Sequence, residues 1–301
     1  RLEDAAFFWN EDRKRPLAER LSGLQQVVFQ ARLGTVYQKA VRMSALAKHV
    51  AGFLDQAPTA TQVEQASLWS KCDLITGMVG EFPELQGVMG GHYLREEGGD
   101  PEVAAAIRDH HRPQGMGDAL PETLLGIVTA LADKWDTLVG CFAVGLAPTG
   151  AKDPFALRRA ALGVIRMVLV HNLHLPLREI LRFAHGLYAE GVLAEGVEQT
   201  VRQVQEFFYG RLNAFLKSEG FDGDLLDAVQ LLDLDDLLDM VLRVRALAVF
   251  KTLPSYGALV AANAPRTLTA TVEVSGYVSS GDGGGGGESA DEDFVGPPWP
   301  R

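Results

Sequence analysis

The sequence predicts an all-α fold followed by a C-terminal tail without a core. Through most of the chain, apolar residues recur at the three- and four-residue intervals of amphipathic helices. No convincing run alternates apolar and polar residues between hairpin turns, as a surface strand would. Beyond residue 268 glycine and acidic residues dominate, and such a segment cannot bury enough apolar surface to offset its ordering entropy. We therefore expect helices up to about residue 268 and a disordered tail over 269–301.

The first half of the helical region contains three apolar stripes, each on one face of an expected helix. They are Val36-Ala40-Met43-Ala47-Val50-Leu54, Leu68-Cys72-Ile75-Val79 and Leu124-Val128-Leu131-Trp135-Leu138. Segments rich in glycine and proline at 98–101, 113–121 and 148–154 interrupt the pattern.

A further stripe, Leu157-Ala161-Val164-Val168, begins after the last of these breaks. Asp153 is expected to cap its N-terminus, and Pro154 suits the first helical position. More helices are expected around 201–212, 225–232 and 238–247. These breaks predict a connector at 1–34 from an upstream domain, helical domains at 35–150 and 151–268, and the tail at 269–301.

The net charge, the cysteines and the apolar stretches of the chain bear on which classes of function are possible. The chain of 301 residues carries a net charge of −11, which argues against non-specific nucleic-acid binding but leaves room for a local basic face. Cys72 and Cys141 both lie in apolar helical patterns and are expected to be reduced core thiols. No stretch reaches the roughly 20 apolar residues of a membrane span. Because the chain begins at Arg1, it is expected to be a fragment.

One candidate constellation is a metal site. His49, Asp73 and Asp133 follow the order of an HD-type metal phosphohydrolase, in which a His-Asp pair and a distant aspartate hold the ion. Here Lys71 and Cys72 precede Asp73, so the paired histidine is missing, and a lysine ammonium would repel a metal. We expect an HD-like helical scaffold with no metal and only degenerate positions at Asp73 and Asp133.

The neighbouring His110 and His111 also suggest a ligand pair. Adjacent helical residues point about 100° apart, so the two rings are expected not to face one ion. No nucleophile elbow and no Walker-type phosphate loop occurs in the sequence. No catalytic residue is therefore expected.

The second candidate is a basic face near one helix start. Lys152, Arg158, Arg159 and Arg166 cluster there, and such a row beside a helix N-terminus can contact phosphate. The alternative is an ordinary solvated helix face. Arg243 and Arg245 form a weaker cluster of the same kind further along the chain.

Four ordered blocks resemble the β subunit of bacterial-type glycyl-tRNA synthetase over roughly residues 3–263. The first begins at Ala6 with AFFWNED, and the second, KCDLITGMVGEFPELQGVMG, runs from Lys71 to Gly90. The third and fourth are LADKWDTLVG from Leu131 and PTGAKDPFALRR from Pro148, where the family usually has serine at the position of Ala151. The family normally continues with a basic helical end, whereas here Ala264-Pro265-Arg266 is followed by the glycine-rich tail.

The resemblance implies the C-terminal half of that β subunit, with an HD-like domain followed by a DALR-type anticodon-binding domain. It implies binding of tRNA(Gly) for ATP-dependent glycylation, with glycine, ATP and Mg²⁺ bound by a catalytic α partner and none by this region. That partner is a separate subunit or a fused domain, so the assembly would be a hetero-tetramer or a dimer of the fused chain. The compartment would be the bacterial cytoplasm, or a chloroplast or mitochondrion if the tail marks an algal or plant enzyme. The alternatives are an HD-type metal phosphohydrolase and a non-catalytic helical adaptor.

Overall fold

The computed structural model describes residues 2–115 and 117–263. Residues 1–253 form one compact unit, and helix α13 (Pro254–Asn263) belongs to a second unit. The tail expected at 269–301 lies outside the described residues. None of the described helices is long and apolar enough to cross a membrane.

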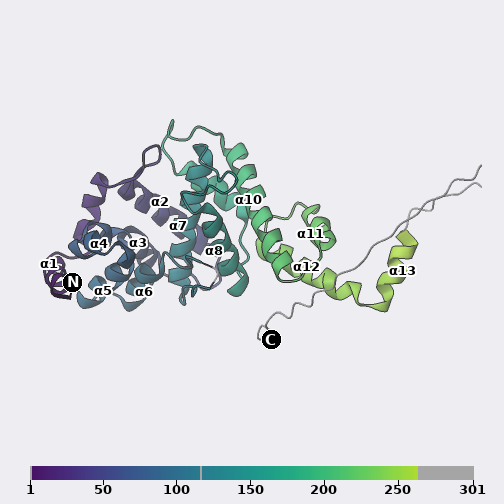
Figure 1. Ribbon diagram of the computed structural model, residues 1–301, viewed down its shortest axis with the longest axis horizontal. Helices are drawn as coiled ribbons and strands as arrows, with labels where there is room; N and C mark the ends of the chain where they lie inside the picture. Colours follow the sequence, from purple (N-terminus) through teal and green to yellow (C-terminus); the bar gives the residue numbers. More distant parts are fainter. Residues whose placement is uncertain (1, 116, 264–301) are drawn as a thin grey trace, which may run out of the picture. The chain divides into compact units, whose positions relative to one another are not determined.

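The first unit is built almost entirely from helices, as predicted (Figure 1). Its elements, including the 3₁₀ segments η1 to η3, are α1 (Leu2–Asp12), η1 (Ala18–Gln26), β1 (Val28–Gln30), β2 (Gly34–Thr35), α2 (Val36–Ala51), α3 (Ala60–Trp69), η2 (Cys72–Ile75), α4 (Gly77–Glu81), η3 (Pro83–Leu85), α5 (Val88–Glu96), α6 (Pro101–Asp109), α7 (Leu124–Ala143), α8 (Leu157–Val170), α9 (Leu177–Gly186), α10 (Val197–Ser218), α11 (Gly223–Gln230) and α12 (Leu237–Lys251). The small antiparallel pair β1–β2 was not predicted, because strands this short show no alternation.

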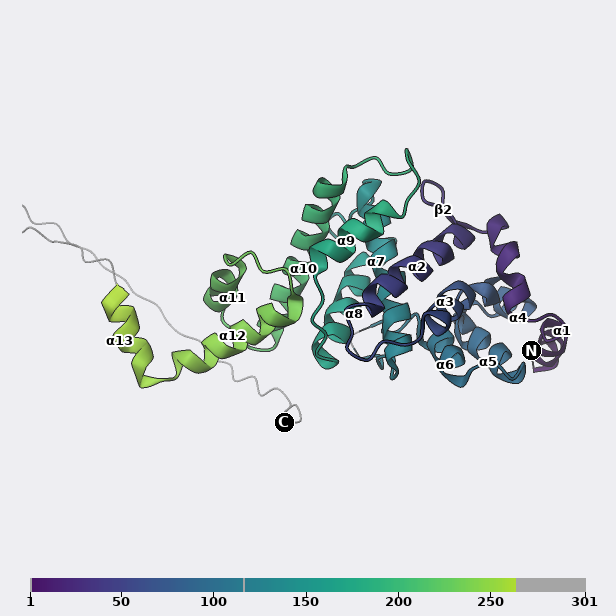
Figure 2. The ribbon, with the colours of Figure 1, turned by 180° about the vertical axis from the view of Figure 1, so that it is seen from behind.

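Helix α7 lies at the centre of the unit, between α2 on one side and α8 and α10 on the other (Figures 1 and 2). Every residue of α7 except Leu124 and Thr137 is buried, which is typical of a helix surrounded by other helices. Thr123 accepts a hydrogen bond from the Gly126 amide and caps its start. Charged residues on α7 are therefore forced into the protein interior.

The structure shows no division into compact units near residue 150, where the sequence predicted a domain boundary. Helices α8, α9 and α10 all pack against α7, so the segments before and after the break share one core. Trp135 on α7 is 1% exposed and belongs to this shared core. A break rich in glycine and proline marks a chain reversal, and only the packing shows whether the flanking helices separate.

Most of the predicted helices are confirmed, with one clear exception. The stripe from Leu68 to Val79 is not one helix, because α3 ends at Trp69 and is followed by η2 and α4. Thr76 caps the start of α4 by accepting a hydrogen bond from the Val79 amide. The carboxylate of Asp12 accepts from the amides of Gly77 and Met78 as well, at 2.8 and 2.9 Å, and this contribution from α1 could not be seen in the local sequence.

Asp153 caps α8 as predicted, although the helix starts later than Pro154. Its two carboxylate oxygens accept from the amides of Leu157 and Arg158 at 2.8 and 2.9 Å. Ala156, which lies between Asp153 and Leu157 in the chain, adopts a left-handed conformation with φ of 54°, and α8 begins at Leu157. The predicted core thiols, Cys72 and Cys141, are both buried and free of disulfides.

Candidate nucleic-acid interface

The six cations of the predicted basic faces divide into two groups. Lys152, Arg159 and Arg245 are exposed, and none of the three makes a side-chain hydrogen bond or ion pair with another described residue. The other three have protein partners. Arg158 donates to the carbonyl of Gly150, Arg166 to the carbonyls of Gly115 and Asp118, and Arg243 to the carboxylate of Asp239.

Arg166 therefore corrects the expectation of a free basic row. Its guanidinium donates at 2.7 Å to the carbonyl oxygen of Gly115 and at 2.9 Å to that of Asp118, and the side chain is half-buried. It ties α8 to the segment between α6 and α7. A residue with this role stabilises the fold, and its guanidinium has fewer donors left for a phosphate.

Arg159 sits in the first turn of α8 and lines two neighbouring pockets. The first, which we call the α8–α10 cleft, has a volume of about 270 Å³. It is lined by Arg158, Arg159, Leu162, Arg211, Ala214, Phe215 and Ser218. No acidic residue lines this cleft, so its three arginines present positive charge to an anion.

Arg211 was not predicted as a site residue. It lies on α10, half-buried, with its guanidinium 5.8 Å from the centre of the Phe207 ring. Its Nε atom is buried and has no hydrogen-bond partner among the described residues. The α10 stripe fixes which face Arg211 occupies, but only the packing of α10 on α8 brings it to Arg159.

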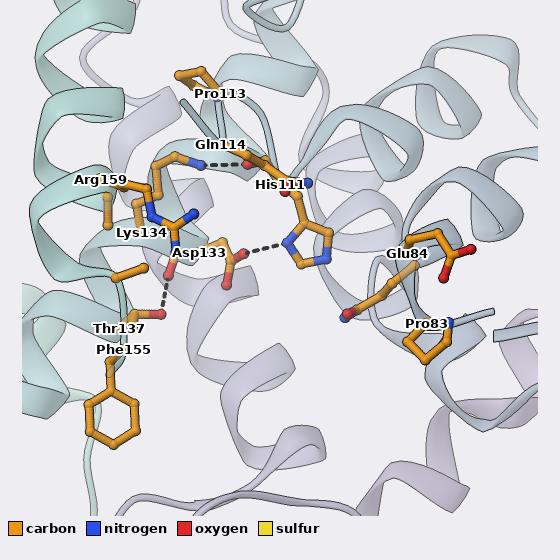
Figure 3. Close-up of a pocket in the computed structure, with 13 residues that line it drawn as sticks. Pro83, Glu84, His111, Pro113, Gln114, Asp133, Lys134, Thr137, Phe155 and Arg159 are labelled. Atoms are coloured by element: carbon orange, nitrogen blue, oxygen red, sulfur yellow. Dashed lines mark hydrogen bonds and ion pairs between the residues drawn. The ribbon is translucent and has the colours of Figure 1, made fainter. Parts of the chain in front are cut away.

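The second pocket, which we call the α7 pocket, has a volume of about 320 Å³ (Figure 3). In that view Phe155, Thr137 and Arg159 lie to one side of Asp133 and His111, and Pro83 and Glu84 lie to the other. The remaining lining residues are Gln86, Pro113, Gln114, Lys134, Ala156 and Ala160.

A buried ion-pair network lies beneath the α7 pocket. The ammonium groups of Lys39 and Lys71 each lie 2.9 Å from a different oxygen of Asp133. Lys39 also contacts Asp136 at 3.1 Å, and Arg42 pairs with Asp136 at 2.6 Å. Buried charges persist only when they are paired in this way.

The network sets the charge state of the pocket. Burial by itself would raise the pKa of Asp133, but the ammonium groups of Lys39 and Lys71 outweigh it and hold that pKa well below its usual range. Burial, reinforced by the Lys71 ammonium, lowers the pKa of His111 to about 3, so its ring is neutral at pH 7. Burial also lowers the pKa of Lys134 to about 8.

The three positions of the HD-type order do not form one ligand set. His49 stacks on Phe183, with ring centroids 3.9 Å apart, and its Nε2 lies 3.6 Å from Glu179 on α9. One oxygen of Asp73 accepts from the amides of Gly87 and Gly90, at 2.6 and 2.9 Å. Asp73 therefore fixes the loop before α5, while Asp133 pairs with the two lysines.

The rings of His110 and His111 lie close together, contrary to expectation. Helix α6 ends at Asp109, and the two rings are tilted by 42° with centroids 3.8 Å apart. Ligand atoms of His110, His111 and Asp133 lie within 4.8 Å of one another, the one such grouping among the residues that the structure describes. Both oxygens of Asp133 already bind an ammonium, so a divalent cation would have to displace Lys71 or Lys39.

Comparison with known proteins agrees with the resemblance seen in the sequence. The family described as "Glycyl-tRNA synthetase beta subunit" matches residues 1–231. The chain is 60% identical over 266 residues to the glycine–tRNA ligase beta subunit of Magnetococcus marinus, covering 87% of this chain and 38% of the relative. It is 47% identical over 264 residues to that of Desulforamulus reducens, again over 87% and 38%.

The matched region is therefore smaller than the expected half of a β subunit, since the chain spans about 38% of the length of these relatives. The family match nevertheless covers most of the chain, including every lining residue of both pockets. This chain belongs to the glycyl-tRNA synthetase β-subunit family.

Proposed function

We propose that this chain is a tRNA-binding part of a glycine–tRNA ligase, and that it contacts the tRNA backbone through Arg159, Arg158 and Arg211. The observation that carries the proposal is Arg159. In a protein of net charge −11, its guanidinium is exposed and without a partner among the described residues, between two pockets. Guanidinium groups suit phosphate because their donors match its oxygens in pairs.

The role proposed for this region is positioning and not chemistry. Holding a tRNA so that its end reaches a distant active site converts an encounter into an oriented, intramolecular one. Glycine, ATP and Mg²⁺ would then be bound by the α partner, either separate or fused. Because the relatives named above come from bacteria, we propose the bacterial cytoplasm as the compartment, with an organelle as the alternative.

For α2 to α7 we propose the HD-like domain that the sequence resemblance implies. For residues 151–268 we propose a different domain assignment from the one that the resemblance implies. Helices α8, α9 and α10 pack on α7 within the first unit, so we propose a tRNA-binding helical extension in place of a separate DALR-type domain. A phosphohydrolase is disfavoured because Lys39 and Lys71 bind both oxygens of Asp133. A purely protein-binding adaptor would bind no tRNA.

The test is the salt dependence of tRNA binding. Binding of tRNA(Gly) to the 301-residue chain is measured by fluorescence anisotropy over a range of KCl concentrations. Arg159→Gln combined with Arg211→Gln is expected to weaken binding and to reduce the log–log salt slope by about one unit per lost phosphate contact. The matched control is Arg32→Gln combined with Arg95→Gln, which removes two exposed charges that line neither pocket.

Equal slopes for the two double variants would contradict the proposal, because the effect would then follow net charge and not position. A loss of stability in the Arg159/Arg211 variant, with the salt slope intact, would assign these arginines to the fold.

A further inference from the structure

Binding of the tRNA backbone by the arginines of the α8–α10 cleft would leave the interior of the α7 pocket without a ligand. Its volume of about 320 Å³ falls within the range of small-molecule sites. It opens beside Arg159, which lines it together with the α8–α10 cleft. Any chain of phosphates held by the cleft would therefore pass the mouth of this pocket.

The walls of the pocket combine flat apolar surfaces with amide groups. Phe155, Pro83 and Pro113 supply the apolar surfaces, and the Phe155 ring is half-buried. The side-chain amides of Gln86 and Gln114 line the pocket and hydrogen-bond to none of the residues that the structure describes. A primary amide both donates and accepts, as the edge of a nucleobase requires.

The charged groups at the base of the pocket are held by protein partners. Asp133 is paired with Lys39 and Lys71, at 2.9 Å each, Lys134 donates to the carbonyl oxygens of His111 and Arg112, and the His111 ring is neutral because burial lowers its pKa to about 3. The exposed charged side chains that line the pocket are Arg159 and Glu84, which lie on opposite sides of Asp133 (Figure 3). A phosphate would therefore bind at the Arg159 end of the entrance, with the ring of the base inside.

We propose that the α7 pocket takes one unpaired RNA nucleotide, with its base against Phe155, its edge at Gln86 and Gln114, and its phosphate on Arg159. The inference rests on the proposed function, which supplies RNA as the ligand, and adds that a single-stranded nucleotide is read here. A base in a duplex cannot enter, since its faces are stacked and its edge is paired.

The test compares a single-stranded RNA octamer with the same strand in a blunt duplex, both labelled with fluorescein, binding to the 301-residue chain. The wild type is expected to prefer the single strand. Phe155→Leu should weaken single-strand binding about tenfold, the usual effect of losing one base–aromatic stack, and leave duplex binding unchanged. Phe155→Trp, which keeps a ring, should restore it, and the matched control Phe7→Leu, at an exposed phenylalanine that lines neither pocket, should retain the preference.

A second measurement needs no variant. An octamer that carries 4-thiouridine is cross-linked to the wild-type chain with long-wavelength light, and the attached peptides are identified. Cross-links within 83–86, 111–114 or 155–160 are expected. Cross-links only elsewhere, or equal binding of single strand and duplex, would overturn the nucleotide pocket.

The outcomes separate the two proposals. If tRNA binding keeps its dependence on Arg159 and Arg211 but Phe155→Leu binds single strands normally, the nucleotide pocket is refuted and backbone binding stands. If neither tRNA nor either octamer binds, both proposals fail.

Discussion

Asp133 is the most consequential buried charge in the structure, and its removal gives the sharpest test of the ion-pair network. Lys39 and Lys71 are 2% and 4% exposed, and both contact its carboxylate at 2.9 Å. In Asp133→Asn, Lys39 retains Asp136, but Lys71 loses the carboxylate it pairs with. Breaking a buried pair from one side costs about 3–5 kcal/mol, and we expect a loss in that range.

Removing the lysine should cost much less. The pKa of Lys71 is lowered, first by burial and then by the Lys39 charge, so its ammonium is already held unfavourably. In Lys71→Met the Asp133 carboxylate still binds Lys39. We therefore expect a loss of about 1 kcal/mol, and the double variant Lys71→Met/Asp133→Asn should be more stable than Asp133→Asn alone.

The assay is urea unfolding followed by circular dichroism, with melting temperatures as a check. A loss of 3–5 kcal/mol corresponds to a fall in Tm of roughly 6–20 °C for a unit of this size. The control is Glu64→Gln, which breaks an exposed pair with Lys48 and should cost under about 1 kcal/mol. If Lys71→Met costs more than Asp133→Asn, or if the double variant is the least stable, the network is not organised around Asp133.

Three further predictions concern pH, packing and metal. Burial raises the pKa of Asp73 to about 6, so its charged form is disfavoured in the folded state. In urea titrations, the free energy of unfolding of the wild type relative to Asp73→Asn should therefore fall by about 2–3 kcal/mol as the pH rises from 4 to 7. A difference that stays constant over this range would contradict the prediction. In Gly140→Ala the added Cβ would lie 2.3 Å from the Tyr188 hydroxyl oxygen, and thermal unfolding should show a loss of about 1–3 kcal/mol. Elemental analysis of protein purified without chelator should find no stoichiometric Mn, Fe or Zn, because Lys71 binds Asp133; a bound metal together with phosphatase activity would refute that reasoning.

Two arginines on α8 are expected to have different roles, one in stability and one in binding, because their side chains reach different parts of the structure. Arg166 and Arg159 stand seven positions apart on α8 and share one side of the helix. Arg166 reaches two carbonyls of the segment between α6 and α7, whereas Arg159 opens onto the two pockets. Their substitutions should therefore separate, with Arg166 affecting unfolding and Arg159 affecting RNA binding.

The sequence by itself determined the helices and their buried faces. Thr35 and Gln38 form the reciprocal capping pair that starts α2, and its predicted stripe from Val36 to Val50 is buried. Such signals are local, because a cap and an apolar face depend on residues within a few positions of one another. The same holds for Asp153, whose capping of α8 was predicted from its place beside Pro154.

Only the tertiary structure decided which charges are free to bind a partner and where the chain divides. Arg211 joins Arg159 because α10 packs on α8, and Lys71 meets Asp133 across a separation of 62 residues. The stripe from Leu68 to Val79 is divided between α3, η2 and α4, and a carboxylate from α1 accepts from the first amides of α4. Helical periodicity fixes the direction of a side chain on its own helix, but its partner comes from another part of the chain, and the sequence carries no local record of that contact.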